Sequence, residues 1–497
     1  MDPVTLQVMV GALRAACEEM GVVLVRSAHS ANVKERRDAS TALFDAHGEM
    51  AMQAEHIPVH LGAMPAAVAA VAAQDPAPGD AFVLNDPFRG GTHLPDITVV
   101  SPIHVEGELA GYAASRAHHA DVGGRIPGSM PADSHTLDEE GVVIEPCRLV
   151  REGELDADVL DSITSRMREP RQRVADLRAQ LAANRTGGAR LIELAERHGL
   201  DVVREAMDAT LDYAERRTRA AIAELGDGER EARDALEATE SDLELRLKAT
   251  VNGDSMTLDF TGSAAQHDGN MNCPLAVTRS ACYFAVRVLA DPDVPPCAGA
   301  YRPVEVVAPE GSLLNARPPA AVVAGNVETS SRVADLVLRA FGRALGQGTM
   351  NNVTLGSDRF TYYETIGGGQ GACADAPGPS AVHVAMSNTL NTPIEALELE
   401  FPLRAVEYRV RRGSGGDGEY RGGDGVVREV EALEAMEFSL LTERRRHQPP
   451  GAAGGSDGAA GRNLLDGEEL PPKALGRLRA GQRLRIETPG GGGHGAA

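Results

Sequence analysis

Residues 79–124, GDAFVLNDPFRGGTHLPDITVVSPIHVEGELAGYAASRAHHADVGG, hold the pattern around which the rest of the chain is organised. The apolar runs at 81–84 and 97–102 predict two short strands, and turn residues at 106–108 predict a hairpin that returns the chain to Tyr112. His93 and Asp96 follow the strand at 81–84. His118, His119 and Asp121 follow the strand to which the hairpin returns the chain. We therefore expect these polar groups to gather at the ends of adjacent strands.

The polar groups in this stretch have the spacing of a metal site. His93 and Asp96 form a His-x-x-Asp pair that lets two ligands from one loop reach the same ion, and His118 arrives from the next strand. Such a set suits Mn, Zn or Fe, and open coordination positions would make the site catalytic. His119 would point to the opposite side of an extended segment. The alternative is that these are polar loop residues that hydrogen-bond a glycine-rich backbone.

Two further histidines are alternative metal ligands. His56 and His60 follow a hairpin predicted at 40–53, and Pro58 stands between them. Proline disfavours helix at the residue before it, so the two histidines are not expected to share a helix face. Both could face the pocket, or both could be hydrogen-bonded loop residues.

Composition excludes several classes of function. The chain has 497 residues and a net charge of -23, which argues against binding to nucleic acid or an anionic membrane. No apolar run approaches the roughly 18 residues of a membrane span, and Met1-Asp2-Pro3 lacks the basic start of a signal peptide. Six scattered cysteines indicate neither a disulfide framework nor a zinc ribbon. A cytoplasmic protein is expected.

The pattern as a whole predicts an α+β fold, mixed and multi-domain, with a long N-terminal helix, a central helical segment and glycine-rich β parts. The long helix should run from Val4 to about Ala28. Four parts are expected: an α+β part with the metal site at 1–150, a helical segment at 151–240, a second α+β part at 241–430, and a closing β segment with a flexible tail at 431–497.

Several local features give narrower expectations. In the helical segment, Gly187-Gly188 should break the chain into helices at 171–184 and 189–198. The charges of 229–244 suggest a solvated connection. The loop at 126–145 is long enough for a lid, a partner contact or a solvated excursion. The last residues, 490–497, should be flexible.

No nucleotide site is evident in the sequence. The chain lacks G-x-x-x-x-G-K-[ST], and no G-x-G-x-x-G opens a helix after a strand. The segment 325–332 precedes an apolar helix and carries capping residues, with substrate binding through Asn326 as the alternative.

Taken together and in order along the chain, seven motifs resemble the B-type subunit of the hydantoinase/5-oxoprolinase family, to which acetone carboxylase is related. They are ERRDASTALFDAHGEM (35–50), HIPVHLGAM (56–64), NDPFRGGTHLPDITVVSP (85–102), HHADVGG (118–124), AGNVETSSR (324–332), NTLNTPIE (388–395) and GSGGDGEYRGG (413–423).

The resemblance implies a division of labour between two chains. A separate A-type subunit would bind ATP and phosphorylate a cyclic amide, and the B-type chain would complete ring opening at a metal held by His93, Asp96 and His118. A hetero-oligomer is then expected. The C-terminal part is short beside carboxylase subunits, which favours cyclic-amide opening. An acetone-carboxylase-type subunit and a non-catalytic, metal-stabilised scaffold are the alternatives.

Further roles follow from the proposed chemistry. Asp121 or His119 would orient a ligand or move protons. Arg89 and Arg116 would hold phosphate oxygens of the activated substrate. Structural or surface ion pairs are the alternative for each of them.

Overall fold

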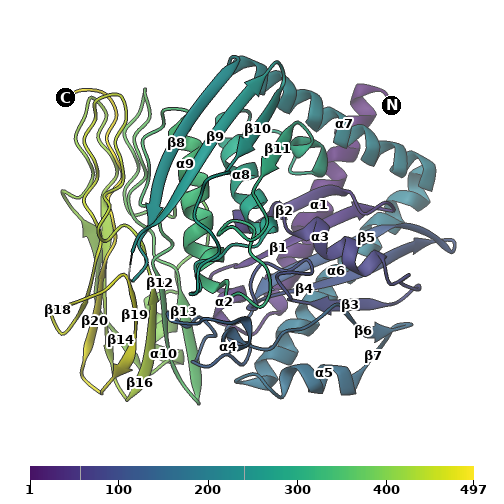
Figure 1. Ribbon diagram of the computed structural model, residues 1–497. Helices are drawn as coiled ribbons and strands as arrows, with labels where there is room; N and C mark the ends of the chain where they lie inside the picture. The colour runs from purple at the N-terminus through teal and green to yellow at the C-terminus, as the bar shows by residue number, and fades with distance from the viewer. Residues whose placement is uncertain (56, 240) are drawn as a thin grey trace.

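The computed structural model describes residues 1–55, 57–239 and 241–497, which form helices packed on four β-sheets (Figure 1). The predicted α+β class is confirmed. None of the helices in these ranges combines the length and apolar character that crossing a bilayer needs. The helices are α1 (Pro3–Ser27), α2 (Ala31–Lys34), α3 (Met64–Ala72), α4 (Leu137–Glu140), α5 (Ala157–Thr164), α6 (Pro170–His198), α7 (Leu200–Glu224), α8 (Leu275–Leu289), α9 (Ser330–Ala340) and α10 (Ile394–Glu400), with short turns η1 (Pro58–His60), η2 (Ala298–Tyr301) and η3 (Gly325–Thr329).

The first sheet has seven strands in the order β2-β1-β5-β4-β3-β6-β7, with every neighbouring pair antiparallel. The predicted hairpin is confirmed, since β4 and β5 pair directly across the turn at Glu106-Gly107. The strands are β1 (Ala39–Asp45), β2 (Met50–Glu55), β3 (Ala81–Leu84), β4 (Asp96–Val105), β5 (Glu108–His118), β6 (Cys147–Arg151) and β7 (Glu154–Leu155).

Two long helices cover one face of this sheet. The Asp2 carboxylate accepts the backbone N–H groups of Val4 and Thr5, which caps α1. The buried residues of α1 recur at helical spacing and pack, together with buried residues of α6, against β1, β2 and β5. The long N-terminal helix predicted from the sequence is therefore confirmed.

The predicted break at Gly187-Gly188 is wrong, because α6 runs unbroken from Pro170 to His198. The physical reason is close helix packing. A Cβ atom on Gly187 would lie 2.3 Å from Sδ of Met20 on α1, so glycine is what lets the two helices approach. Packing of this kind outweighs the weak helix propensity of glycine.

The two glycines should respond oppositely to alanine. Gly187→Ala is expected to destabilise the chain by about 1–2 kcal/mol, since overpacking against the buried Met20 exceeds the gain in helix propensity. Gly188→Ala is the matched control, because its Cβ would meet nothing closer than 3.7 Å, at Ile103. It should raise the melting temperature measured by calorimetry. Equal effects from both changes would contradict this account of the packing.

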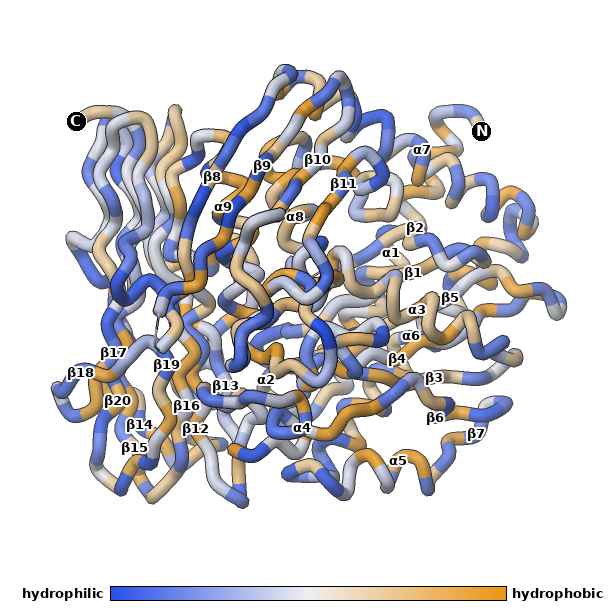
Figure 2. The backbone as a smooth tube through the Cα atoms, viewed as in Figure 1, coloured by the Kyte–Doolittle hydropathy of each residue, from blue (hydrophilic) through white to orange (hydrophobic). Residues whose placement is uncertain are grey.

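The second sheet, ordered β11-β10-β9-β8, corrects the expectation of a solvated connection at 229–244. Its strands are β8 (Gly228–Leu236), β9 (Leu243–Asn252), β10 (Ser255–Asp259) and β11 (Val304–Val307). Hydrophilic and hydrophobic residues alternate along β9 (Figure 2), so charges on one face coexist with burial of the other. On β8, Asp234 accepts hydrogen bonds from Arg332 and Arg444, which are both buried.

Two C-terminal sheets pack face to face around a shared apolar core, at the left of Figure 1. Their orders are β13-β12-β16-β19 and β14-β15-β20-β17-β18. The strands are β12 (Asn352–Ser357), β13 (Phe360–Glu364), β14 (Leu403–Arg411), β15 (Gly425–Ala432), β16 (Met436–Leu441), β17 (Arg462–Leu465), β18 (Glu468–Leu470), β19 (Lys473–Leu478) and β20 (Arg483–Glu487). The part boundaries expected near residues 150, 240 and 430 stay a proposal.

Beyond these sheets the glycine-rich segments 367–371, 413–423 and 489–495 run side by side, and we call them the glycine stack (Figure 1, upper left). Gly423 donates a backbone hydrogen bond to Gln370, and Gly491 donates one to Gly423. A Cβ atom on Gly491 would lie 2.0 Å from the Gln370 carbonyl oxygen. The expectation of a flexible tail is therefore wrong for residues 490–495, whose backbone is hydrogen-bonded to neighbouring segments, and the glycines at 490–493 lie too close to backbone atoms to admit a side chain.

The long connection at 126–145 is mostly buried and contains α4, so it is not a solvated excursion. The Glu140 carboxylate accepts backbone N–H groups from Val322 and Val323, and Asn270 donates to the Pro131 carbonyl. Burial raises the pKa of Glu140 to about 8, although these hydrogen bonds oppose the shift. The contacts of Glu140 and Asn270 fix residues 126–145 against the second half of the chain.

Candidate metal centre

The sheet register brings the predicted trio together. Asp96 is the first residue of β4 and stands directly opposite His118, the last residue of β5. His93 lies three residues before Asp96, in the loop that enters β4. One ligand atom from each of the three lies within 4.8 Å of the other two, and all three residues are buried. We call His93, Asp96 and His118 the metal-type cluster.

The Asp96 carboxylate is the centre of this cluster. Its Oδ2 lies 3.1 Å from Nδ1 of His93 and its Oδ1 lies 3.3 Å from Nδ1 of His118. Oδ2 also lies 3.2 Å from Nε2 of His60 and accepts a hydrogen bond from Thr92 at 2.6 Å. His60, an alternative ligand in the sequence analysis, therefore adjoins the cluster. His56 lies outside the described residues.

The electrostatics favour the ionised carboxylate of Asp96 and the neutral imidazole of His118. Burial alone would raise the pKa of Asp96, but the imidazoles of His93 and His60 and the contact with His118 hold that pKa well below its usual value. Burial lowers the pKa of His118, which favours neutral imidazole. An anionic carboxylate beside neutral imidazole is the donor set of a divalent metal.

The hydrogen bonding of the imidazoles fits the same interpretation. Neither ring nitrogen of His93 makes a hydrogen bond to any described residue, and the same holds for Nε2 of His118. Leaving a buried polar group unpaired costs about 1–3 kcal/mol. Ligands held at about 2.0–2.2 Å from one ion lie roughly 3–3.5 Å apart. The two contacts of Asp96 have such lengths, and one ligand atom from each of the three residues lies within 4.8 Å of the others. The residues therefore fit a divalent metal ion.

A residue from a distant sheet supports His118. The ring of Tyr363, on β13, stacks on His118 with centroids 4.5 Å apart and planes inclined by 11°. The guanidinium of Arg36 lies 4.7 Å from the centroid of the Tyr363 ring, and the Tyr363 hydroxyl donates to Asn352. The C-terminal half of the chain thereby fixes the orientation of a cluster residue. No periodicity in the sequence signals this contact.

The two residues expected to act beside the ligands lie around the cluster rather than in it. His119 turns away, as predicted from alternation, and its Nε2 lies 3.0 Å from Oε1 of Gln180 on α6. Burial lowers the pKa of His119 to about 4. Asp121 accepts hydrogen bonds from the backbone of Gly123 and from Arg168, which organises the following turn.

The predicted substrate-binding residues occupy three different places. Arg116 is buried beside Asp96 and donates to Thr98 and to the Gly90 carbonyl, while its Nη1 makes no hydrogen bond to a described residue. Burial lowers the pKa of Arg116 to about 10. Arg89 is exposed and pairs with Glu145. Asn326 is buried in η3, and no hydrogen bond in the described part of the chain joins Arg89 or Asn326 to the cluster.

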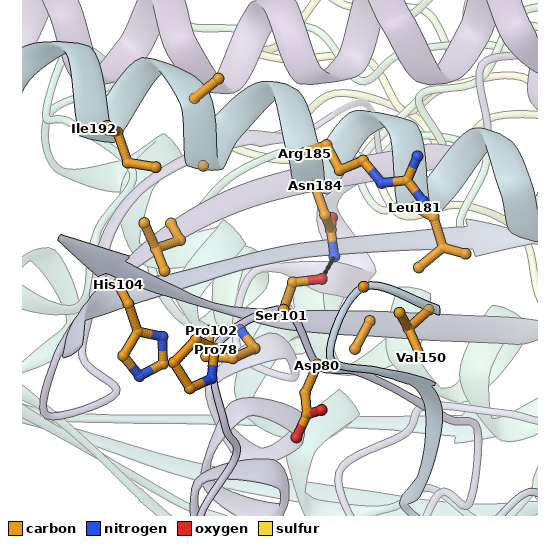
Figure 3. A pocket seen from close by; sticks show the side chains of 16 residues that line it. Pro78, Asp80, Ser101, Pro102, His104, Val150, Leu181, Asn184, Arg185 and Ile192 are labelled. Atoms are coloured by element: carbon orange, nitrogen blue, oxygen red, sulfur yellow. Dashed lines mark hydrogen bonds between the residues drawn. The ribbon is translucent and has the colours of Figure 1, made fainter. Parts of the chain in front are cut away.

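Two pockets differ in their relation to the cluster. One, of about 400 Å³, lies between α6 and the far end of β4, where Asn184 donates to Ser101 beside His104 (Figure 3). The other, of about 340 Å³, is lined by Pro58 and Leu61, which flank His60. Neither pocket is lined by a residue of the cluster, and the second comes nearest in sequence, through the residues on either side of His60.

The fold and the cluster together define a multi-sheet α+β protein with a buried candidate metal centre. A family model described as Hydantoinase B/oxoprolinase matches residues 2–497, and the chain belongs to this family. The resemblance of the sequence motifs to that family is thereby confirmed.

Comparison with individual proteins adds detail. A 5-oxoprolinase of Dictyostelium discoideum is 38% identical over 510 residues, which cover 100% of this chain but 40% of that protein. The chain therefore spans about two-fifths of that enzyme. The crystal structure of an ATP-dependent caprolactamase from Pseudomonas jessenii superimposes with a TM-score of 0.93 at 29% identity, covering 100% of this chain and 91% of that one. A nucleotide-free acetone carboxylase shares the fold, with a TM-score of 0.89, 19% identity, and coverage of 99% of this chain and 76% of that one.

Proposed function

We propose that the chain is the B-type subunit of an ATP-dependent cyclic-amide hydrolase, and that it completes ring opening of a substrate phosphorylated by an A-type partner. The observation that carries this proposal is the buried cluster of His93, Asp96 and His118, in which Nε2 of each imidazole has no hydrogen-bond partner among the described residues; the set fits a divalent metal such as Mn, Zn or Fe. Membership of the hydantoinase B/oxoprolinase family supports the substrate class.

Hydrolysis is favoured over carboxylation by the comparisons. The chain covers 91% of the caprolactamase chain at 29% identity, but 76% of the acetone carboxylase chain at 19% identity. The likeness to the carboxylase therefore supports the fold alone. A carboxylase subunit remains the alternative, and bicarbonate-dependent turnover would identify it.

An ATP-binding partner is supported by the large part of a related enzyme that this chain does not cover. Its match covers 40% of the Dictyostelium enzyme, and the sequence contains no phosphate-binding loop motif. Activation of the amide is therefore assigned to a second, A-type chain in a hetero-oligomer. Phosphorylation of the amide oxygen makes the carbon electrophilic, so that addition of water and departure of the protonated ring nitrogen would break the C–N bond and leave an acyl phosphate. A second water would then release phosphate and the carboxylate.

The residues of this chain would prepare the reacting centre. A divalent ion held by the cluster would supply Lewis acidity and lower the pKa of water toward neutrality. Asp96 anchors the ligand set, and Thr92 and His60 fix its carboxylate through the contacts described above. Arg116 would place its unpaired Nη1 beside substrate oxygens, with Gly90 and Thr98 holding the rest of the guanidinium.

The remaining proposed roles belong to residues outside the cluster. His119 would keep the end of β5 in register through Gln180, and any proton transfer by it would use the neutral ring. Asp121 would hold the turn after the cluster through Arg168. Arg89 would make an early contact with phosphate from its exposed position, and Asn326 would offer its unpaired Oδ1 to the substrate.

A non-catalytic scaffold is a second candidate, because the cluster is fully buried and its metal could simply tie β4 to β5. In that case removal of the metal would lower stability without changing product formation at permissive temperature.

The first test asks which of the two chains hydrolyses ATP. The purified chain alone is expected to hydrolyse no ATP above the uncatalysed rate, and ATP turnover coupled to ring opening should require addition of the A-type chain. Phosphate release and product should be followed together, with the A-type chain alone as the control. Robust ATP hydrolysis by this chain alone would refute the proposed division of labour.

A further inference from the structure

The aromatic contact of His118 is the end of a longer series of contacts that begins at Glu328. Nδ2 of Asn352 donates to Oε1 of Glu328 at 3.2 Å, and the Tyr363 hydroxyl donates to Oδ1 of Asn352 at 2.6 Å. The Tyr363 ring then stacks on His118. The series joins η3, β12, β13 and β5. We call Glu328, Asn352 and Tyr363 the Tyr363 network.

The three residues of the Tyr363 network are buried and are held by the backbone around them. Asn352 and Tyr363 lie on the paired strands β12 and β13, and β12 also pairs with β16. Glu328 belongs to η3, a π-helical turn of a kind that is often found at functional sites. A Cβ atom on Gly325 at the start of this turn would lie 1.7 Å from the Asn272 carbonyl oxygen, so the turn is packed tightly in place.

Glu328 determines which end of the Asn352 amide faces Tyr363. Oε1 of Glu328 and the Leu441 carbonyl both accept from Nδ2 of Asn352, which leaves Oδ1 for the Tyr363 hydroxyl. The backbone N–H of Met350 donates to the same Oε1 at 3.1 Å and holds the carboxyl group. An acceptor at position 328 is therefore what orients the amide, and the amide in turn orients the tyrosine.

The second oxygen of Glu328 takes no part in these contacts. Oε2 makes no hydrogen bond to any described residue, and a buried polar atom without a partner is unfavourable. Burial, together with the charge of Glu443, raises the pKa of Glu328 to about 7. The neutral carboxyl group keeps Oε1 as an acceptor, so the contact with Asn352 does not need the negative charge.

We propose that Glu328 is a positioning residue for the metal-type cluster, and that it acts through Asn352 and Tyr363 to hold the plane of the His118 ring. This inference rests on the proposed function, since it presumes the metal ion assigned there. Groups that orient a ligand from outside a metal site typically change metal affinity about 10–100-fold when they are removed.

The hydroxyl of Tyr363 gives the first test, with Co²⁺ as the probe. The full chain is freed of metal and reloaded with Co²⁺, and its affinity and visible absorption bands are measured. Tyr363→Phe keeps the ring on His118 but removes the bond to Asn352. It should weaken Co²⁺ binding about tenfold and shift the absorption bands, because the imidazole loses its fixed orientation.

Tyr362→Phe is the matched control for this experiment. Tyr362 is the preceding residue of the same strand, and its side chain packs in the core between the two C-terminal sheets, away from His118. Its hydroxyl donates to Glu364, so this variant also loses a buried hydrogen bond. It should lower the melting temperature in the same way as Tyr363→Phe, while its Co²⁺ affinity and absorption bands stay those of the wild type.

A pair of changes at Glu328 separates positioning from charge. Glu328→Gln should keep the Co²⁺ affinity within about twofold, because its side-chain oxygen can accept from Asn352 and Met350 as Oε1 does. Glu328→Leu removes the acceptor and should weaken Co²⁺ binding about tenfold. Both changes remove the carboxylate, so an equal loss in both would show an effect of charge and overturn the proposal. Tyr363→Phe decides the matter if Glu328→Leu does not fold.

The outcomes distinguish the Tyr363 network from the proposed function. If Tyr363→Phe matches Tyr362→Phe in Co²⁺ affinity and absorption bands, the network is purely structural and the proposal is wrong, while the metal site stands. If Asp96→Asn binds Co²⁺ as tightly as the wild type, the ion does not occupy the cluster. The metal site of the proposed function then fails, and the role of Glu328 fails with it.

Discussion

His118→Ala is expected to uncouple the assembled enzyme, so that ATP is still consumed while ring-opened product falls by about 10³-fold or more. The activation step takes place on the A-type chain in the proposed function and should not sense the loss of an imidazole here. Completion of the reaction would lose a ligand of the metal-type cluster and the surface on which Tyr363 stacks. A loss of several kcal/mol of transition-state stabilisation corresponds to this factor.

The control for this experiment is His104→Ala, on the same pair of strands but at the pocket beyond the far end of β4. It should retain the wild-type ratio of product to ATP. Both quantities should be measured in one reaction with saturating A-type chain. Full product formation by His118→Ala would mean that the cluster is structural and that the catalytic interpretation of this chain fails.

Asp96→Asn is expected to reduce bound metal from roughly one ion per chain to a small fraction of that. The change keeps the volume of the side chain but removes the charge that both imidazoles face at 3.1 and 3.3 Å. Amide oxygen is a much poorer ligand than carboxylate for these ions, and loss of one protein ligand weakens a three-ligand site strongly. Elemental analysis after gel filtration gives the metal content directly, and His93→Ala should behave alike.

His119→Asn is the matched control for metal content, since His119 is equally buried but turns toward Gln180. It should keep its metal. His60→Ala tests the neighbouring histidine, whose Nε2 lies 3.2 Å from Asp96. If Asp96→Asn and His93→Ala both keep their metal while His60→Ala loses it, the ion belongs elsewhere than in the proposed cluster.

The cluster could be predicted because its geometry follows from local pattern. Alternation of apolar residues fixed the hairpin of β4 and β5, and antiparallel register then places Asp96 opposite His118. The same alternation turned His119 to the other side. Each of these inferences needs only neighbouring residues, which is why the trio was accessible from the sequence.

Features that depend on long-range packing were missed. The break expected at Gly187 is absent because Met20, far away in the chain, packs where a side chain would stand. The charges along β8 predicted a solvated connection. In the fold, Asp234 of this strand accepts hydrogen bonds from Arg332 and Arg444. Tyr363 reaches His118 from another sheet. Local propensity depends on neighbouring residues and does not specify contacts between residues far apart in the sequence. Such contacts can be seen only in the folded structure.

The glycine stack has a consequence for the rate at which this chain folds. Its backbone hydrogen bonds join Gln370 to Gly423 and Gly423 to Gly491, so segments distant in sequence must be closed into loops before any of these bonds can form. Glycine also loses more conformational entropy on ordering than any other residue. Contacts with long sequence separation and high entropic cost slow the search for the native topology. The glycine stack should therefore order late, after the hairpin that carries the cluster is in place.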